Sequence, residues 1–275
     1  MPEGHTLHRL ATSLRDGFAG DVVRVSSPQG RFAESAAVLD GLVLREARSF
    51  GKHLFVEFEQ DRQVHVHLGL YGKFPVRPAP APDPVGQVRM RLVGPSAYAD
   101  LRGATACELV TAEQRGAILD RLGPDPLDPD ADPDRAWARI SRSRSPIGGM
   151  LMDQAVIAGI GNVYRAEVLF RHRMHPLRPG RTLRVGQFRA MWEDLVVLLA
   201  EGVRVGRIET LRAEDEPAAR AVSKVERKRV RNYVYRRDGR PCLLCGATVR
   251  TEELQGRNLF WCPRCQPVFR SRAVG

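Results

Sequence analysis

Two pairs of cysteines constrain what this chain can fold into more than any other feature of its sequence. Each pair has the spacing Cys-x2-Cys, and sixteen residues separate the first pair, Cys242 and Cys245, from the second, Cys262 and Cys265. Two short turns that each present two thiolates complete a closed tetrahedron, which is typical of a structural zinc site. Two disulfides are the alternative, but we do not expect them in a sequence that shows no secretory h-region, and so few residues could hardly fold without a metal. We therefore predict one structural Zn²⁺ per chain.

The first residues, Met1-Pro-Glu-Gly-His-Thr6, place a proline beside a carboxyl group. After removal of Met1, Pro2 would carry a free secondary amine. Because an N-terminal amine titrates at about pH 8 and a lysine at about 10.4, a fraction of Pro2 would be uncharged and nucleophilic at neutral pH. Glu3 is the adjacent acid or base that carbon–nitrogen chemistry at an aldehyde-like carbon needs. A chance Met-Pro start is the alternative, since so short a motif needs a confirming context.

The composition suits a globular protein with an anionic partner. A length of 275 residues, 43% of them hydrophobic, is enough for two packed domains, and the net charge is +11. No apolar run approaches the ~20 residues of a membrane span, so we expect no membrane partner and a location in the cytoplasm, at the nucleoid. Positive charge gathers between Ala221 and Arg240, as in proteins that follow a phosphate backbone. The basic residues of this stretch are Lys224, Arg227, Lys228, Arg229, Arg231, Arg236, Arg237 and Arg240.

Hydrophobic periodicity indicates a β-rich N-terminal part. Apolar residues first recur at helical spacing from Thr6 to Arg15. One later strand places His65 and His67 on its polar face, which we interpret as an exposed face because no third metal ligand is evident. Cys107 is expected to be a buried strand residue. The alternation that predicts strands occurs in Asp21–Val25, Leu42–Ala47, Leu54–Phe58, Gln63–Leu68 and Gln87–Val93.

Proline and glycine mark the breaks between elements. The proline-rich segment Pro75–Pro84 is predicted to be an exposed loop, since it suits neither a helix nor a central strand. The acidic segment Gly123–Pro133 is typical of a linker. Helices are expected over Ser145–Ala158 and Val163–Arg171, and the glycine-rich turn between them can bring N–H groups to a phosphate, with Asn162 as the helix cap. A helical hairpin without a ligand is the alternative.

Short motifs occur in a fixed order along the chain: Pro2-Glu3, Gly51-Lys52, His67–Gly72, Leu122–Leu127, Leu151–Gln154, Gly159–Glu167, Tyr233–Cys242 and Gly256–Cys262. Together they resemble the formamidopyrimidine-DNA glycosylase and endonuclease VIII (Fpg/Nei) family of base-excision repair enzymes. The resemblance implies a multidomain α+β fold and a monomer that binds double-stranded DNA with damaged bases or abasic sites. The implied parts are an N-terminal antiparallel β-sandwich catalytic domain over residues 1–122, a linker over 123–134, a helix-two-turn-helix domain over 135–235 and a zinc finger over 236–270.

The resemblance also implies a mechanism, in which Pro2 attacks C1′ of the damaged nucleotide and Glu3 supplies a proton to the sugar. The base leaves, a Schiff base remains, and β,δ-elimination opens the strand. Lys52, Asn162 and Arg257 match family residues that contact phosphates near the lesion, and we count Lys52 and Arg257 with the catalytic group. Without the resemblance, Lys52 would be interpreted as a solvated lysine at a strand end and Arg257 as a surface charge on a hairpin.

Leu70 and Tyr71 match the pair that the endonuclease VIII branch inserts into the gap left by an extruded base. The formamidopyrimidine branch has methionine and a small residue there, and an aspartate-proline-arginine-arginine-phenylalanine signature where this chain has Asp100-Leu-Arg-Gly103. Both departures favour oxidised pyrimidines over 8-oxoguanine as substrates. Thr6 and Gly69 also depart from the family pattern. For Leu70 and Tyr71, a hairpin packed into its own domain is the alternative.

Three other functions stay open from the sequence. They are a glycosylase that prefers 8-oxoguanine or formamidopyrimidine, a catalytically silent protein that binds damaged DNA, and a zinc-ribbon RNA-associated protein. The Pro2-Glu3 start favours an enzyme, because a pure binding protein does not need it. We therefore predict a bifunctional DNA glycosylase and abasic-site lyase that removes oxidised bases, mainly pyrimidines.

Overall fold

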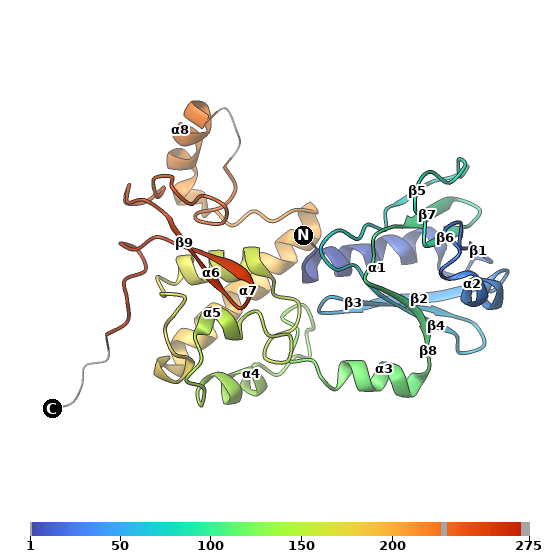
Figure 1. Ribbon diagram of the computed structural model, residues 1–275, viewed down its shortest axis with the longest axis horizontal. Helices are drawn as coiled ribbons and strands as arrows, with labels where there is room; N and C mark the ends of the chain where they lie inside the picture. The colour runs from blue at the N-terminus through green and yellow to red at the C-terminus, as the bar shows by residue number, and fades with distance from the viewer. Residues whose placement is uncertain (1, 227–229, 271–275) are drawn as a thin grey trace. The chain divides into compact units, whose positions relative to one another are not determined.

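The computed structural model describes residues 2–226 and 230–270 (Figure 1). Contacts within the chain divide it into two compact units, residues 1–122 and 123–275, which are taken in turn. Across the described ranges, the helices are too short or too polar to cross a membrane. Three residues of the basic stretch, Arg227, Lys228 and Arg229, lie outside the described residues.

The first unit is built from two four-stranded antiparallel sheets and one long helix, α1. The strand order is β1-β6-β7-β5 in one sheet and β2-β3-β4-β8 in the other. Apolar residues of both sheets and of α1 form a single core, which is the arrangement of a β-sandwich. The elements are α1 (Gly4–Phe18), β1 (Arg24–Ser26), α2 (Ala33–Leu39), β2 (Leu44–Phe50), β3 (His53–Phe58), β4 (Gln63–His67), β5 (Val76–Pro78), β6 (Met90–Val93), β7 (Ala97–Leu101), β8 (Ala106–Val110) and α3 (Ala112–Leu119).

Helix α1 forms where its apolar spacing predicts it, and it extends beyond the predicted range at both ends. Leu7, Leu14 and Phe18 lie on one buried stripe against the sheets. A reciprocal capping box between Glu3 and Thr6 starts the helix, with the Glu3 N–H donating to Thr6 Oγ1 at 3.4 Å. The cap therefore fixes the backbone directly after Pro2.

Two predictions for the first unit are wrong in part. The proline-rich segment contains a strand, β5, which forms the edge of its sheet and pairs only with β7. Pro78 is tolerated there because an edge strand needs hydrogen bonds on one side only. His65 is also not on an exposed face, since the residue is only 5% exposed. Cys107 is buried on β8, as predicted.

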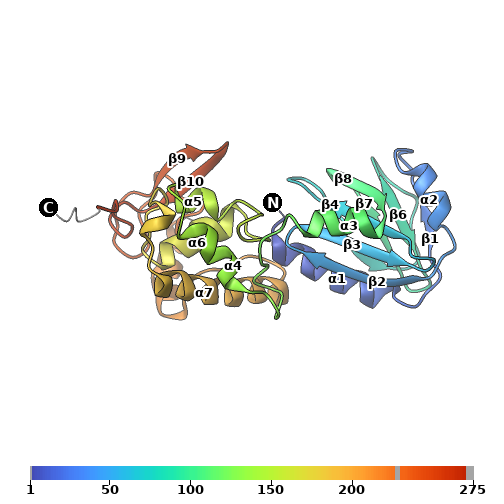
Figure 2. The same cartoon turned by 90° about the horizontal axis from the view of Figure 1, so that it is seen from below.

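The second unit places helix α6 at the centre of a helical core. Residues Asn162–Phe170 of α6 are all buried, and the helix contacts α5, α7 and β10 (Figure 2). Such complete burial explains why apolar residues occur on several sides of this helix. The elements of this unit are α4 (Pro133–Ile140), α5 (Ile147–Met150), α6 (Asn162–Arg171), the short 3-10 helix η1 (Gly180–Thr182), α7 (Val185–Val205), η2 (Ala213–Asp215), α8 (Glu216–Glu226), β9 (Arg250–Leu254) and β10 (Arg257–Trp261).

The helix predicted over Ser145–Ala158 is wrong for most of its length, because only α5 is helical. Gly148 and Gly149 lie inside α5 itself, so the end of the helix has another cause. After α5, Asp153 Oδ1 accepts from the Ala155 N–H at 2.9 Å, and the Gln154 amide donates to the Ile160 carbonyl at 2.9 Å. These local side-chain bonds stabilise a turn in competition with the helix.

Candidate functional site

The N-terminus of α1 carries the predicted nucleophile and its neighbouring acid. Glu3 is fully buried, and Pro2, which precedes it, is partly exposed. His5 lies one residue into the helix, where burial and the charge of the N-terminus lower its pKa to about 4. His5 is therefore neutral at physiological pH and adds no positive charge beside the Pro2 amine.

A histidine cluster lies beside Lys52 on the sheet that contains β3, β4 and β8. Lys52 occupies the turn before β3, and the next residue, His53, directs Nδ1 at His65 Nε2 at 2.9 Å. His65 Nδ1 in turn contacts Glu108 Oε1 at 3.1 Å. Burial lowers the pKa of His53 to about 4, with further lowering by His65, His67, Arg121 and Lys52.

This cluster explains why the exposed-face interpretation of His65 fails. Its partners come from two other strands, 12 and 43 residues away in the chain, so no local pattern could show them. The ring nitrogens of His53 and His65 point at each other instead of at a shared metal position. In the described part of the chain, only the four cysteines bring three or more potential ligand atoms of His, Cys, Asp or Glu close together.

Leu70 and Tyr71 project from a tight turn after β4. Tyr71 is 83% exposed and Leu70 is 40% exposed. The turn depends on Gly69, which has φ +64°. A Cβ added at this position would lie 2.4 Å from Thr105 Cγ2. Any larger residue at position 69 would therefore require a different turn here. Because of its exposure, the Tyr71 ring in particular is not packed into its own domain.

In the second unit, Asn162 and the strand of Arg257 meet. Asn162 Nδ2 donates to the Asn258 carbonyl at 3.1 Å, and Asn162 Oδ1 accepts from Arg165. The prediction that Asn162 caps α6 is wrong, because Gly161 is the N-cap residue. Arg257 starts β10 and lines a hollow of about 420 Å³ together with Ser143, Ser145 and Gln255.

Only part of the predicted basic stretch lies on the protein surface. Arg237 is buried and donates to the Pro241 carbonyl at 3.1 Å. Arg231 lies 3.6 Å from Glu209, and Arg236 stacks over the Tyr235 ring. Several of these charges therefore stabilise the segment that leads into the cysteine motif. The clustering of basic residues in the sequence could not distinguish this structural role from a binding face.

Sequence patterns assign no individual role to Glu167, although its buried carboxylate organises the same region. It accepts hydrogen bonds from the backbone N–H groups of Tyr233, Val234 and Tyr235, and from Thr210 Oγ1. Burial raises the pKa of Glu167, while these four donors act in the opposite direction. A glutamate in an otherwise buried helix was the signal that could have identified it.

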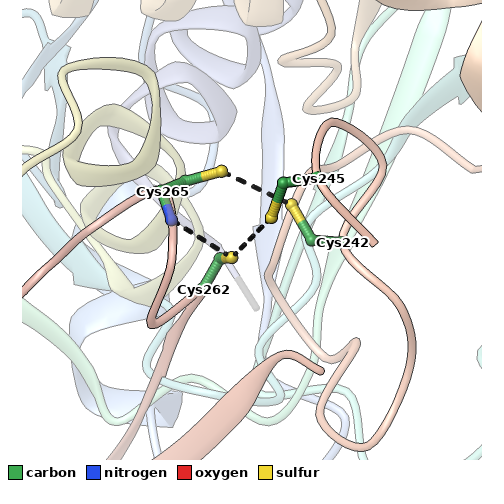
Figure 3. Close-up of side chains that lie close together, drawn as sticks. All are labelled: Cys242, Cys245, Cys262 and Cys265. Carbon is green, nitrogen blue, oxygen red and sulfur yellow. Dashed lines mark hydrogen bonds between the residues drawn. The ribbon is translucent and has the colours of Figure 1, made fainter. Parts of the chain in front are cut away.

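The four cysteines converge as their spacing predicts (Figure 3). Cys242 Sγ lies 3.8 Å from Cys265 Sγ, and Cys245 Sγ lies 3.4 Å from Cys262 Sγ. All four sulfurs are within 4.8 Å of one another. A tetrahedron with Zn–S bonds of about 2.3 Å has sulfur–sulfur edges of about 3.8 Å, so these residues fit a zinc ion. Beside them, β10 pairs with β9 and packs on α6.

Three family models match successive segments of the chain. Residues 1–107 match the formamidopyrimidine-DNA glycosylase N-terminal domain, residues 122–213 match the formamidopyrimidine-DNA glycosylase H2TH domain, and residues 239–268 match the zinc finger found in FPG and IleRS. The chain belongs to the Fpg/Nei family. It is therefore a DNA repair enzyme of the glycosylase and abasic-site lyase class, and the predicted structural zinc site is confirmed.

Relatives of this Fpg/Nei protein agree over nearly the full length. Endonuclease 8 1 of Mycobacterium tuberculosis is 54% identical over 270 residues, which cover 97% of this chain and 100% of that protein. Formamidopyrimidine-DNA glycosylase of Thermomicrobium roseum is 32% identical over 289 residues, covering 98% and 99%. The crystal structure of Lactococcus lactis Fpg with abasic-site DNA matches with a TM-score of 0.78 at 20% identity, over 97% of this chain and 100% of that chain. This likeness confirms the predicted α+β fold.

Proposed function

We propose that this protein removes oxidised pyrimidine bases from double-stranded DNA and then cleaves the strand by β,δ-elimination. The observation that carries the proposal is the pairing of Pro2 with a fully buried Glu3 at the start of α1 in an Fpg/Nei chain. The pyrimidine preference is supported by the exposed pair Leu70 and Tyr71, and by the 54% identity to a protein named endonuclease 8.

In the proposed reaction, the Pro2 nitrogen attacks C1′ of the damaged nucleotide and the base leaves with the electrons of the N-glycosidic bond. Glu3 protonates the sugar ring oxygen, so that the ring opens and an iminium forms between Pro2 and C1′. The iminium acidifies C2′–H, and loss of that proton expels the 3′ phosphate. A second elimination expels the 5′ phosphate and leaves a one-nucleotide gap.

DNA binding is proposed to use phosphate contacts from both units. Lys52 would hold the backbone in the first unit, and Asn162 and Arg257 would hold it in the second. Tyr71 and Leu70 would fill the space vacated by the extruded base. We further propose that residues 1–122 carry the catalytic step, that 123–134 link it to the helical region 135–235, and that the finger 236–270 holds Arg257 in place.

Borohydride trapping tests this proposal directly. The processed protein is incubated with a duplex that holds one dihydrouracil, and separately with one 8-oxoguanine, in the presence of borohydride, which reduces an iminium to a stable amine. We expect a covalent adduct that maps to Pro2 and is stronger with dihydrouracil. The matched control is the same protein with an uncleaved N-terminal tag, whose amide nitrogen is not nucleophilic; it should bind the duplex and give no adduct.

The outcomes separate the alternatives. A stronger adduct with 8-oxoguanine would contradict the pyrimidine preference and indicate the substrate preference of the formamidopyrimidine branch. No adduct on either lesion or on an abasic site would indicate a catalytically silent damage-binding protein. An adduct formed by the tagged protein would show that Pro2 is not the nucleophile.

A further inference from the structure

Arg165 is a charged side chain inside the second unit. It lies on α6, is 1% exposed and is the largest of the fully buried side chains in the described residues. Burial of a guanidinium is costly unless its donors are used. Arg165 donates to the Gly148 carbonyl on α5 at 3.3 Å, to the Asn258 carbonyl on β10 at 3.0 Å, and to Asn162 Oδ1.

These contacts determine which way the Asn162 amide faces. A guanidinium has only donors, so the Asn162 atom next to Arg165 must be the oxygen. The Asn258 carbonyl is only an acceptor, so the Asn162 atom next to it must be the nitrogen. Both neighbours require the same orientation, and a flipped amide would oppose donor to donor and acceptor to acceptor.

The orientation of the Asn162 amide decides which of its atoms can contact an anion. With Oδ1 held by Arg165 and one N–H used by Asn258, the second N–H of Asn162 is the group that can face a phosphate. The same guanidinium holds the carbonyl of Asn258, the residue after Arg257. One buried side chain thereby ties the amide of α6 to the strand that carries the arginine of the zinc-finger hairpin.

We propose that Arg165 is a positioning residue that holds Asn162 and the Arg257 strand together as one phosphate-binding unit. The inference rests on the phosphate contacts proposed above for Asn162 and Arg257. Arginine suits this position because its planar fork reaches three acceptors on three elements at once. A lysine ammonium would be a single point on a flexible stem and could not hold the same geometry.

A double-mutant cycle tests the proposal with a duplex that contains a tetrahydrofuran abasic analogue as the probe. Asn162→Ala should weaken binding about tenfold, as expected for loss of a hydrogen bond to a charged group. Arg165→Gln should weaken it at least as much, although Arg165 is buried, and the double variant should bind no more weakly than Arg165→Gln alone. Arg165→Gln should also lower the salt slope of binding by about 1, because Arg257 loses its position.

Arg171→Gln is the matched control, since it removes a mostly buried arginine from the same helix. Arg171 pairs with Asp194 at 2.6 Å, and within the described residues it makes no hydrogen bond to Asn162 or β10. Its loss should therefore lower Tm but leave probe affinity and salt slope unchanged. Zinc content and Tm of every variant are measured beside the binding. If Arg165→Gln does not fold, Asn162→Asp tests the orientation instead: it keeps the pairing with Arg165 and removes the N–H donors, so binding should fall at least tenfold.

Additive losses in the cycle, or an Asn162→Asp protein that binds as well as the original, would overturn the positioning role. An Asn162→Ala loss with no loss in folded Arg165→Gln would overturn it while leaving the proposed phosphate contact intact. If Asn162→Ala and Arg257→Ala both bind normally, the proposed contacts themselves are wrong, and the inference fails with them.

Discussion

Acid should destabilise the first unit because two of its histidines are held neutral by the fold. The pKa of His5 and that of His53 are each lowered to about 4, in both cases mainly by burial and then by nearby positive charge. In the unfolded chain a histidine titrates at about 6.5. Between pH 6.5 and 4 the unfolded chain therefore binds more protons than the folded one, and the free energy of unfolding falls as the pH falls.

The size of the effect follows from these two pKa values. At pH 5, a shift from about 6.5 to about 4 lowers the unfolding free energy by about 2 kcal/mol for each histidine. His5 and His53 together contribute about 4 kcal/mol, against a total of about 5–15 kcal/mol for a typical domain. The stability is present above pH 6.5 and is lost progressively toward pH 4.

Hydrogen exchange can resolve this loss because the two units have separate reporters. Trp137, Trp192 and Trp261 all lie in the second unit, so tryptophan fluorescence does not report on the first. Amides of β3 and β4 report on the first unit, and their opening free energies are compared at pH 7 and pH 5 after correction for intrinsic exchange. Wild type should lose about 4 kcal/mol between these pH values.

The His53→Gln variant tests the assignment. Its side chain can still donate to His65 but does not titrate, so the loss between pH 7 and pH 5 should fall to about 2 kcal/mol. The denaturation midpoint reported by the tryptophans should match that of wild type at each pH. An unchanged acid loss in the β3 and β4 amides would refute the argument from burial.

Three further outcomes follow from the site. Cys245→Ala should lose zinc, measured by atomic emission, and bind all duplexes more weakly, because the hairpin of Arg257 would no longer be held; full metal content would contradict this. Glu167→Gln should lower stability by about 3 kcal/mol in tryptophan-monitored denaturation, since its new N–H₂ would face backbone N–H donors; an unchanged midpoint would contradict it. Tyr71→Ala should slow excision of dihydrouracil while undamaged duplex binds as before, and equal excision rates would show that this exposed ring does not support base extrusion.

Much of the local structure could be predicted because its causes are local. The stripe Leu7, Leu14 and Phe18 places α1 without knowledge of its neighbours, and the capping residues lie within the same few positions. The predicted helix over 145–158 failed for a cause that is also local but was given too little weight. The side chains of Asp153 and Gln154 favour a turn directly after α5.

The site residues likewise divide into those set by local sequence and those set by contacts with distant residues. The zinc ligands follow from spacing, since two short turns present paired sulfurs wherever the chain brings them together. The partners of His65 lie on strands 12 and 43 residues away, and Asn162 bonds to a carbonyl 96 residues away. No sequence period encodes such pairings, because strand register and helix packing decide them only when the chain is folded.

By itself the sequence determined the metal site, the N-terminal helix with its Pro2-Glu3 start, and the family that the chain resembles. Only the tertiary structure decided that His65 is buried, that Arg237 faces inward, and which way the Asn162 amide points. The physical reason is that composition and spacing specify which groups are available, whereas burial and hydrogen-bond direction depend on which distant groups meet them.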